Sequence, residues 1–386
     1  MVELWPFAAS GEIVETLEWR TDVLQTRAAE QRIALRLRPR VILTLRHRLD
    51  GPGLARAAAL ARAGFAEQWH VPLWHHAARP AVTLGSGDVA IALAATEDFA
   101  GAEHAALAVD GGEAALVALA AIEPDRLVLA ERLGAALPAA SVAAARIAVA
   151  PVCRGVFAAA LDIARRRQGN ATATATFLLP DSPGLPSPDL PDAETPTWLG
   201  RPVLVDPSVI RQPLATTLRQ AVEYVDNGFG PVVVEPLRDL VARGETITLR
   251  AHGPAARARL RRWLLDLRGR QASLWLPSWG RELRLTAPMS AGATLMRVEP
   301  LGAAEDWAGR SIVIETPGGL VFRSVTAAIT EAGEHLLSLS ASVGEPLGVE
   351  TPVHLMTLVR SDADRIELRH DAVACEVALP VVEAPA

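Results

Sequence analysis

Residues 64–74 read GFAEQWHVPLW and residues 269–279 read GRQASLWLPSW, so a glycine, an apolar run and a Pro-x-Trp sequence occur twice. A similar offset of 204 or 205 positions relates earlier pairs, such as Thr44-Leu45-Arg46 and Thr248-Leu249-Arg250. The repeats of solenoids and propellers run to roughly 20 to 50 residues. The longer period seen here predicts two homologous domains in tandem.

The length of the chain, 386 residues, fits two domains of about 100 to 200 residues, each able to bury a core. Prolines crowd the stretch between the copies, and each proline fixes its own φ and removes a backbone donor. We therefore predict a first β-rich domain over residues 1–178, an extended proline-rich linker over residues 179–215, and a second β-rich domain, a duplicate of the first, over residues 216–386. The prolines concerned are Pro180, Pro183, Pro186, Pro188, Pro191, Pro196, Pro202, Pro207 and Pro213.

Apolar side chains alternate with other residues near the start of the first copy, and residues 246–249 hold the same place in the second. A period of two predicts strands with one buried face. The apolar positions in the first copy are Ile33, Leu35, Leu37, Val41, Leu43 and Leu45.

A helix is predicted next in each copy. Between Pro254, which suits a first turn, and Gly269, which suits a C-terminal stop, apolar side chains recur at helical spacing. The counterpart in the first copy runs from about Leu54 to Phe65. The predicted fold class is therefore mainly β (α+β), with two tandem β-sandwich or barrel-like domains that each contain one inserted helix.

The composition is typical of a globular protein, with 50% hydrophobic and 21% charged residues. A net charge of −6 argues against nucleic acid bound over the whole surface. The two cysteines, Cys153 and Cys375, lack the spacing of a zinc site or a disulfide framework. We expect no secretory leader and no membrane span, because the first residues lack a leader pattern and no run of 18 residues is apolar throughout.

His70, His75 and His76 form a cluster in the sequence, and neighbouring imidazoles are typical of metal sites. The second copy has Trp275 and Gly280 in place of His70 and His75, so the repeat keeps its scaffold without these ligands. No HExxH or comparable spacing accompanies them. We therefore expect neither a metal nor another cofactor.

Four tryptophans flank the repeated prolines, and aromatic faces of this kind can stack on sugar rings. The alternative is that the rings pack the helix against the sheet. Because the motif follows a helix at the same distance in both copies, we favour packing over a binding role. The four residues are Trp69, Trp74, Trp275 and Trp279.

Adjacent acids also occur in both copies, as Glu97-Asp98 and Glu305-Asp306. Paired carboxylates can cleave glycosidic bonds, so a wall-degrading enzyme is one hypothesis. Neighbours on a strand point to opposite faces, however, and such a pair does not converge on one bond. We predict instead that the chain is not an enzyme and that each pair precedes a core aromatic at a turn or strand end.

The run Thr21-Asp22-Val23, followed by Glu30-Gln31-Arg32 and an arginine-rich strand, resembles the start of distal tail and related tail-tip proteins of long-tailed bacteriophages and gene transfer agents. Residues 269–279 are similar to a helix, glycine, strand and Leu-Pro-x-Trp pattern in phage virion proteins of the same kind. Members of the family often have glycine where this chain has Ala29. The resemblance covers about half of the chain and supplies no catalytic residues.

The resemblance implies a structural role in the virion. Such proteins are β-rich and assemble as six-fold rings. They join the tail tube to the baseplate hub and host-binding proteins, around a lumen for the tape measure and DNA. We accordingly expect a homo-oligomeric ring, a hexamer by this resemblance, that is assembled in the host cytoplasm, becomes part of the tail tip, and makes no sequence-specific contacts with nucleic acid. The alternative is a carbohydrate-binding module in host attachment.

A closed ring needs a heterologous interface between subunits. We place this interface on the N-terminal strands from Glu30 to Arg48, where arginines could bind carboxylates of the next subunit in a bidentate manner. Solvated strand arginines are the alternative, since surface ion pairs are individually weak. The residues concerned are Arg32, Arg36, Arg38, Arg40, Arg46 and Arg48.

Overall fold

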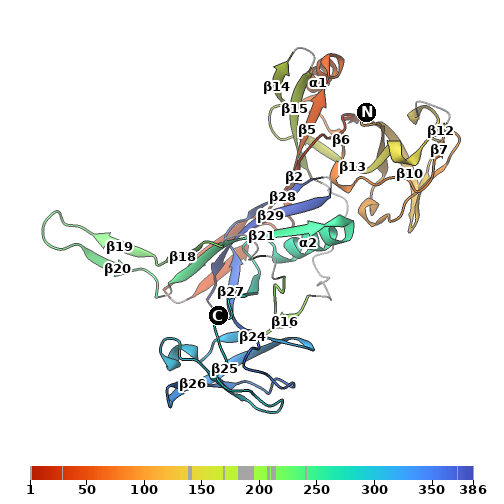
Figure 1. Ribbon diagram of the computed structural model, residues 1–386. Helices are drawn as coiled ribbons and strands as arrows, with labels where there is room; N and C mark the ends of the chain where they lie inside the picture. The colour runs from red at the N-terminus through yellow and green to blue at the C-terminus, as the bar shows by residue number, and fades with distance from the viewer. Residues whose placement is uncertain are drawn as a thin grey trace.

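The computed structural model describes residues 2–27, 29–137, 141–167, 170–180, 195–206, 209, 214–239, 241–371 and 373–385. Within these ranges the chain is mainly β, with one α-helix in each half (Figure 1), which confirms the prediction of a mainly β fold with one helix in each half. Neither of these two helices has the length and apolar character needed to cross a membrane.

One antiparallel sheet runs through both halves of the molecule. Every neighbouring pair along it is hydrogen-bonded, and the order of pairing is not the order in the sequence. The N-terminal strand β2 joins the halves, because it lies between a strand of the first half and a strand of the second. In order along the sheet, the strands are β14 (Asp162–Arg167), β15 (Asn170–Leu179), β5 (Arg40–Leu49), β2 (Ile13–Glu18), β28 (Arg365–His370), β29 (Ala374–Glu383), β21 (Ala242–His252) and β18 (Thr216–Arg219).

The same succession of elements follows β5 and β21. We call the described parts of residues 2–179 and 214–385 unit 1 and unit 2. In unit 1 the elements after β5 are α1 (Gly51–Gly64), β6 (Trp69–Pro72), β8 (Ala90–Ala92), β9 (His104–Val109), β10 (Ala115–Glu123), β11 (Arg126–Leu129) and β13 (Ile147–Phe157). In unit 2 they are α2 (Gly253–Leu267), β22 (Ser273–Pro277), β23 (Leu295–Val298), β24 (Ser311–Thr316), β25 (Gly319–Glu331), β26 (Glu334–Leu339) and β27 (Val353–Ser361).

Corresponding elements of the two units make the same pairings. Strand β6 pairs with β13 as β22 pairs with β27, and β9 pairs with β10 as β24 pairs with β25. Likewise β5 pairs with β15 as β21 pairs with β29. The two units are thus copies in topology as well as in sequence.

Each unit also has a hairpin that follows β2 or β18 directly. In unit 1 it consists of β3 (Thr21–Gln25) and β4 (Glu30–Ala34), and in unit 2 of β19 (Val222–Val225) and β20 (Val233–Pro236). Figure 1 shows the β19–β20 hairpin extending away from the rest of the chain. Short strands complete the fold: β1 (Glu3–Leu4), β7 (Leu84–Gly85), β12 (Ser141–Val142), β16 (Thr197–Trp198) and β17 (Arg201–Pro202).

The strand pairings correct the sequence alignment of the copies ahead of the helices. Thr44 lies opposite Thr176, and Thr246 lies opposite Pro380. Pro380 is the counterpart of Thr176, because the residue after β27 donates to its carbonyl as the residue after β13 donates to the Thr176 carbonyl. Thr44 therefore corresponds to Thr246, and its alignment with Thr248 was wrong. A shift of two residues leaves every side chain on the same face of a strand, so the alternating pattern could not reveal it.

The offset between the copies grows within the helical segment. Gly51-Pro52 begins α1 as Gly253-Pro254 begins α2, an offset of 202 residues, whereas Gly64 at the end of α1 corresponds to Gly269 just after α2, an offset of 205. The Asp50 side chain caps α1 by accepting from the Gly53 N–H at 2.8 Å. At the end of α2, Arg268 and Gly269 both have positive φ, which suits the predicted glycine stop.

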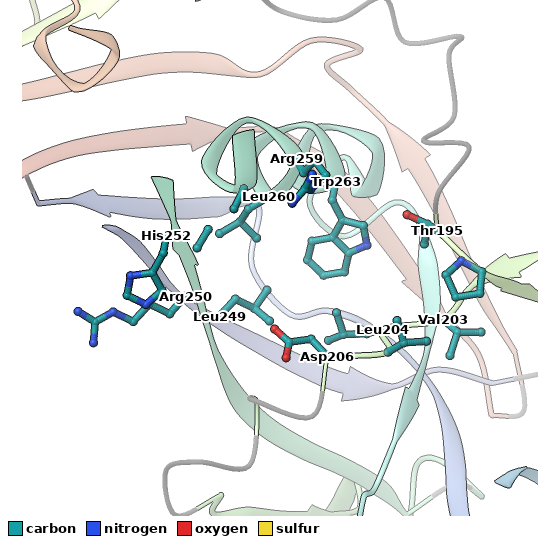
Figure 2. Close-up of a pocket in the computed structure, with 14 residues that line it drawn as sticks. Thr195, Val203, Leu204, Asp206, Leu249, Arg250, His252, Arg259, Leu260 and Trp263 are labelled. Atoms are coloured by element: carbon teal, nitrogen blue, oxygen red, sulfur yellow. The ribbon is translucent and has the colours of Figure 1, made fainter. Parts of the chain in front are cut away.

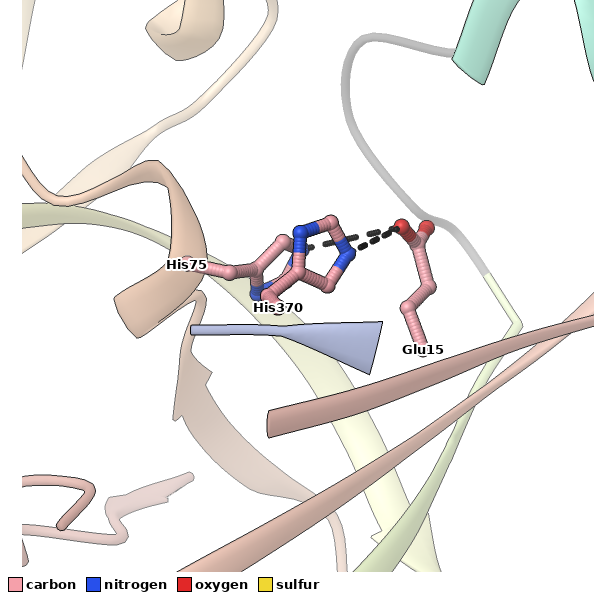
Figure 3. Close-up of side chains that lie close together, drawn as sticks. All are labelled: Glu15, His75 and His370. Carbon is pink, nitrogen blue, oxygen red and sulfur yellow. Dashed lines mark ion pairs between the residues drawn. The ribbon is translucent and has the colours of Figure 1, made fainter. Parts of the chain in front are cut away.

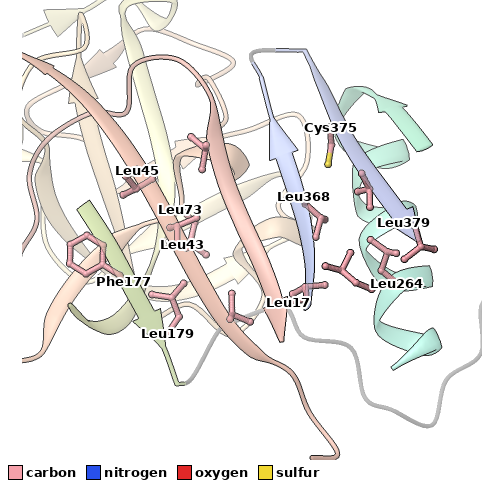
Figure 4. Packing of buried hydrophobic residues seen from close by; sticks show 14 of the residues in the cluster. Leu17, Leu43, Leu45, Leu73, Phe177, Leu179, Leu264, Leu368, Cys375 and Leu379 are labelled. Atoms are coloured by element: carbon pink, nitrogen blue, oxygen red, sulfur yellow. The ribbon is translucent and has the colours of Figure 1, made fainter. Parts of the chain in front are cut away.

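The largest cluster of buried side chains is shared by the two units. It takes Leu17, Leu43 and Phe177 from unit 1 and Leu264 and Leu379 from unit 2 (Figure 4). Two further clusters lie in the outer lobes of the units, one formed by side chains from residues 84–149 and the other by side chains from residues 283–353. The expectation of a separate core in each half therefore fits the outer lobes only, because β2 and β28 join the units into one sheet.

The first predicted strand face is not buried. Ile33, Leu35 and Leu37 are 39%, 55% and 69% exposed, although their alternation predicted a buried face. The reason is that the β3–β4 hairpin contacts unit 2 through its other, polar face, from which Glu30 reaches Arg360 at 2.7 Å. The next strand behaves as predicted, because Val41, Leu43 and Leu45 are at most 1% exposed.

Part of the predicted linker packs on unit 2. Val203 is 1% exposed and bridges to Trp275, and the Leu204 N–H donates to the Trp275 carbonyl at 2.9 Å. The Trp198 indole donates to Ser311 Oγ at 3.1 Å. Most prolines of the predicted linker fall in residues 181–194, 207–208 and 210–213, which lie outside the described residues.

Candidate functional site

The four motif tryptophans lie against the buried core. Trp69 and Trp275 are 1% and 8% exposed, and their indole N–H groups donate to the Gly64 and Trp198 carbonyls. Trp74 and Trp279 are partly buried against the shared core. A sugar platform needs an open aromatic face, which Trp69 and Trp275 do not offer, so their positions favour packing over binding.

The histidine cluster predicted from the sequence is divided in the structure. His70 packs beside His104, with ring centroids 4.7 Å apart, and His76 lies 3.2 Å from Asp98. His75, on the 3-10 helix Trp74–His76, turns towards the boundary between the units. His70 therefore lies apart, whereas the rings of His75 and His76 pack against each other with centroids 4.2 Å apart.

A buried ion cluster lies where the units meet, formed by Glu15 of β2, His75, His370 of β28 and Arg261 of α2. Figure 3 shows the first three of these side chains. Arg261 donates from Nε and Nη2 to Glu15 Oε1 at 2.8 and 2.7 Å. Glu15 Oε2 lies 3.4 Å from His370 Nε2 and 3.9 Å from His75 Nε2. Sequence reasoning named only His75, since the partners come from strands and a helix far apart in the chain.

The environment of this cluster shifts its protonation. Burial alone would raise the pKa of Glu15, but Arg261, His370 and His75 together hold it well below its usual value. Burial lowers the pKa of both His75 and His370, and neighbouring positive groups add to this. Both imidazoles are thus held neutral beside an ionised carboxylate.

The cluster has the donor types of a metal site but an unsuitable charge arrangement. Glu15, His75 and His370 each offer a ligand atom, and these atoms lie within 4.8 Å of one another. The Arg261 guanidinium, however, already binds Glu15 Oε1 and would repel a cation there. We therefore interpret the cluster as an ion pair that holds unit 1 to unit 2.

The repeated acids lie on 3-10 turns. Glu97 and Asp98 belong to a turn that ends at Phe99, and Glu305 and Asp306 to a turn that ends at Trp307. Both aromatics are buried, at 1% and 6% exposed. The acids thus begin turns that anchor an aromatic in the core. This confirms the prediction of acids at a turn before a core aromatic. The acids do not lie on strands, so the expectation that they point to opposite faces of a strand was wrong.

A hollow of about 500 Å³ lies between α2, β21 and residues 195–206. Figure 2 shows the Trp263 ring of α2 beside it, with Leu249 of β21 and Leu204 on the other sides. Its walls are mainly the apolar side chains that pack the helix over the strand, so we assign no reaction to it.

The two ends of the long sheet are unpaired within the described chain. Strand β14 is hydrogen-bonded to β15 alone, and β18 to β21 alone. Every residue of β18 is exposed, including Leu218 at 68%. An open strand edge is a template on which another strand can pair.

The β19–β20 hairpin exposes apolar residues along its length. Tyr224 is 68% exposed, Phe229 at the tip 82%, and Val232, Val233 and Val234 between 51% and 56%. Large exposed apolar patches are rare on monomeric proteins, so this hairpin is a candidate site of interaction. The run of valines after Gly230 and Pro231 is the sequence signal for this hairpin. A comparison of residues shared by the two copies does not reveal it, because the first copy has no such run.

The arginines assigned to a subunit interface are divided in their roles. Arg32 donates to the Gln271 carbonyl and Ser273 Oγ of unit 2, both at 2.9 Å, and Arg36 donates to the Glu18 carbonyl at 2.8 Å. Arg40 lies 4.0 Å from Glu18. The other three, Arg38, Arg46 and Arg48, are exposed. Arg32 thus joins two units of the same chain.

No known protein family matches the sequence, and the comparison with curated proteins finds no significant similarity.

Proposed function

We propose that the chain is a structural component of the tail tip of a long-tailed bacteriophage or gene transfer agent, where it forms a ring between the tail tube and the hub or host-binding proteins. One observation carries this proposal: among the described residues, a continuous eight-stranded sheet ends in an unpaired edge on both sides. A molecule with two different open edges associates head to tail, and head-to-tail contacts form a ring when the rotation closes.

A ring of this kind suits a conduit. Sheets joined edge to edge close into a barrel, and barrels of about 16 to 18 strands already enclose water. Two or more copies of this eight-stranded sheet would reach that size. Such a lumen fits a tape measure and, later, DNA.

The partners in this proposal are other tail proteins, namely the tail tube, the hub and the tape measure. The protein would be assembled in the host cytoplasm and reside in the virion, with no catalytic step and no cofactor. Carbohydrate binding has less support, because Trp69 and Trp275 are buried.

Immunogold labelling of particles from the strain that carries this gene tests the proposal. We expect gold at one end of the tail, and we expect peptides of the chain in the mass spectrum of purified particles. Particles without the protein, or labelled only on the head, would contradict the tail-tip role.

A further inference from the structure

The contact between unit 1 and unit 2 inside the chain indicates how unit 2 could contact unit 1 of a second chain. Strand β2 of unit 1 pairs with its own β5 and also with β28 of unit 2. Since β18 pairs with β21 as β2 pairs with β5, β18 is the counterpart of β2. Strand β14 pairs with β15 as β28 pairs with β29, so β14 is the counterpart of β28. The contact that β2 makes with β28 therefore has a counterpart between β18 and β14, and both of those edges are open within the described chain.

The register expected between β18 and β14 follows from the register between β2 and β28. Leu17 lies opposite Ile366, and both are at most 1% exposed. Their counterparts are Leu218, which is 68% exposed, and Leu161, which is half-buried. An apolar pair thus recurs at the same position. One half of it lies in unit 2 and the other in unit 1.

The two hairpins extend the correspondence. Inside the chain, Glu30 of β4 binds Arg360 at 2.7 Å, and the two side chains are 2% and 5% exposed. The counterpart of Glu30 is Val232, and the counterpart of Arg360 is Val156. A buried ion pair is therefore replaced on both sides by valine.

A second contact changes in the same way. Arg32 donates to residues 270–273 of unit 2. Its counterpart on the projecting hairpin is Val234, and residues 270–273 correspond to residues 65–68 of unit 1. That stretch begins with Phe65, which is 44% exposed and stacks on Phe157 at 4.7 Å. Polar partners meet inside the chain, and apolar counterparts remain uncovered.

The tip of the hairpin has a counterpart contact too. Arg27, at the tip of the β3–β4 hairpin, lies 3.1 Å from Asp239. The counterpart of Asp239 is Leu37, whose 69% exposure contradicted its predicted burial. The corresponding tip of the β19–β20 hairpin carries Phe229, which is 82% exposed. An exposed aromatic and an exposed leucine thus occupy the positions that correspond to Arg27 and Asp239.

We infer that β18 of one chain pairs antiparallel with β14 of a second copy, and that the β19–β20 hairpin then covers the apolar surface formed by Phe65, Val156, Phe157 and Leu161 of that copy. The partner is another copy of this chain because only unit 1 carries the counterparts of the surface that holds the β3–β4 hairpin. This pairing deepens the proposed function. Only the closure of the paired chains into a ring rests on that function.

A pair of adjacent valines tests the hairpin contact. Val234 lies on the face that corresponds to Arg32, whereas Val233 lies on the opposite face of the same strand and is similarly exposed. We expect Val234→Asp to shift the mass measured by light scattering from oligomer towards the 40.9 kDa monomer. The matched control, Val233→Asp, should leave the oligomer mass unchanged. Equal effects of the two substitutions, or none from Val234→Asp, would overturn the assigned face.

Paired cysteines test the strand pairing itself. Thr217 and Asp162 are counterparts of Thr16 and Glu367, which lie opposite each other. They belong to opposite ends of the sheet, so a disulfide between them can form only between chains. We expect Thr217→Cys with Asp162→Cys to give a ladder of linked chains on non-reducing gels. Thr217→Cys with Ile163→Cys, which places one thiol on the other face, should give none.

The outcomes separate this pairing from the tail-tip role. Rings in electron micrographs, with no ladder from the protein that carries Thr217→Cys and Asp162→Cys, would overturn the pairing and leave the tail-tip role intact. A ladder from open filaments would support the pairing and contradict a ring. A wild-type protein that stays monomeric at high concentration would overturn the pairing, whereas gold labelling of particles tests the role independently.

Discussion

Glu15 holds the two units together through one carboxylate. Its Oε1 receives two hydrogen bonds from Arg261, and both side chains are at most 9% exposed. Removing one partner of a buried ion pair leaves the other charge uncompensated, which costs about 3 to 5 kcal/mol. We expect Glu15→Gln to lower the free energy of unfolding by that amount, as measured by urea denaturation.

The exposed pair Arg154–Glu103 provides the control for Glu15→Gln, because its side chains are 53% and 73% exposed. Solvent screens such pairs, so Glu103→Gln should leave the urea midpoint nearly unchanged. Equal effects of the two substitutions would show that Glu15 and Arg261 do not form a buried pair in solution.

Buried histidines make stability depend on pH. Burial lowers the pKa of His75 and His370 below their ordinary 6.5, and that of His47 to about 4. The unfolded chain therefore binds more protons than the folded chain once the pH falls below about 6.5, and stability falls with it. Glu15, whose pKa is also lowered, acts in the same direction below its ordinary 4.5.

We expect the urea midpoint to be level from about pH 8 to 7 and to decline steadily from about pH 6.5 to 5. The variant His47→Gln should show a shallower decline whatever its absolute stability, because one buried imidazole no longer titrates. A midpoint that stays constant, or rises, towards the acid end of this range would contradict neutral buried imidazoles.

The hairpins show what a sequence pattern can and cannot determine. Alternation predicted a strand at Ile33, Leu35 and Leu37 but gave the wrong buried face, since the polar face contacts unit 2. The helix between Pro254 and Gly269 could be predicted from the sequence, because helix caps and apolar periodicity are local signals. The Glu15–Arg261 pair could not be predicted, because its residues meet only when β2 pairs with a strand of unit 2.

Asp364 fixes the β3–β4 hairpin on unit 2. Its carboxylate accepts from the Thr21 N–H at 2.6 Å, from Thr21 Oγ1 at 2.9 Å and from the Arg270 N–H at 3.1 Å. A hydrogen bond to a charged group contributes about 1.5 to 3 kcal/mol. We expect Asp364→Ala to loosen the hairpin and to speed tryptic cleavage after Arg27 several-fold, as followed by mass spectrometry of timed digests.

The turn at Asp371 supplies a matched control for Asp364→Ala. Its carboxylate accepts from the Val373 and Ala374 N–H groups but touches no part of the β3–β4 hairpin among the described contacts. Asp371→Ala should therefore leave the rate of cleavage after Arg27 unchanged. Similar acceleration in both variants would mean that cleavage follows global unfolding and not release of the hairpin.

The proposed assembly would contain two kinds of joint in alternation. Inside the chain the units meet through buried ion pairs, Glu15 with Arg261 and Glu30 with Arg360. Between chains, the counterparts of Glu30 and Arg360 would be Val232 and Val156, and the counterpart of Glu15 would be Thr216, so neither ion pair would recur. The first joint needs no second molecule, whereas the proposed second joint would form only above a threshold concentration. A ring of n chains then contains 2n units, so six units require three chains and six chains supply twelve.

The difference between the joints gives assembly a characteristic response to salt. Sulfate strengthens the burial of apolar surface, and any salt screens the repulsion between chains that each carry a net charge of −6. We therefore expect ammonium sulfate to raise the oligomer fraction in sedimentation velocity at fixed protein concentration. An interface built on the exposed Arg38, Arg46 and Arg48 would behave in the opposite way, because salt weakens exposed ion pairs. Dissociation on adding salt would therefore reject the apolar joint in favour of the arginine strands.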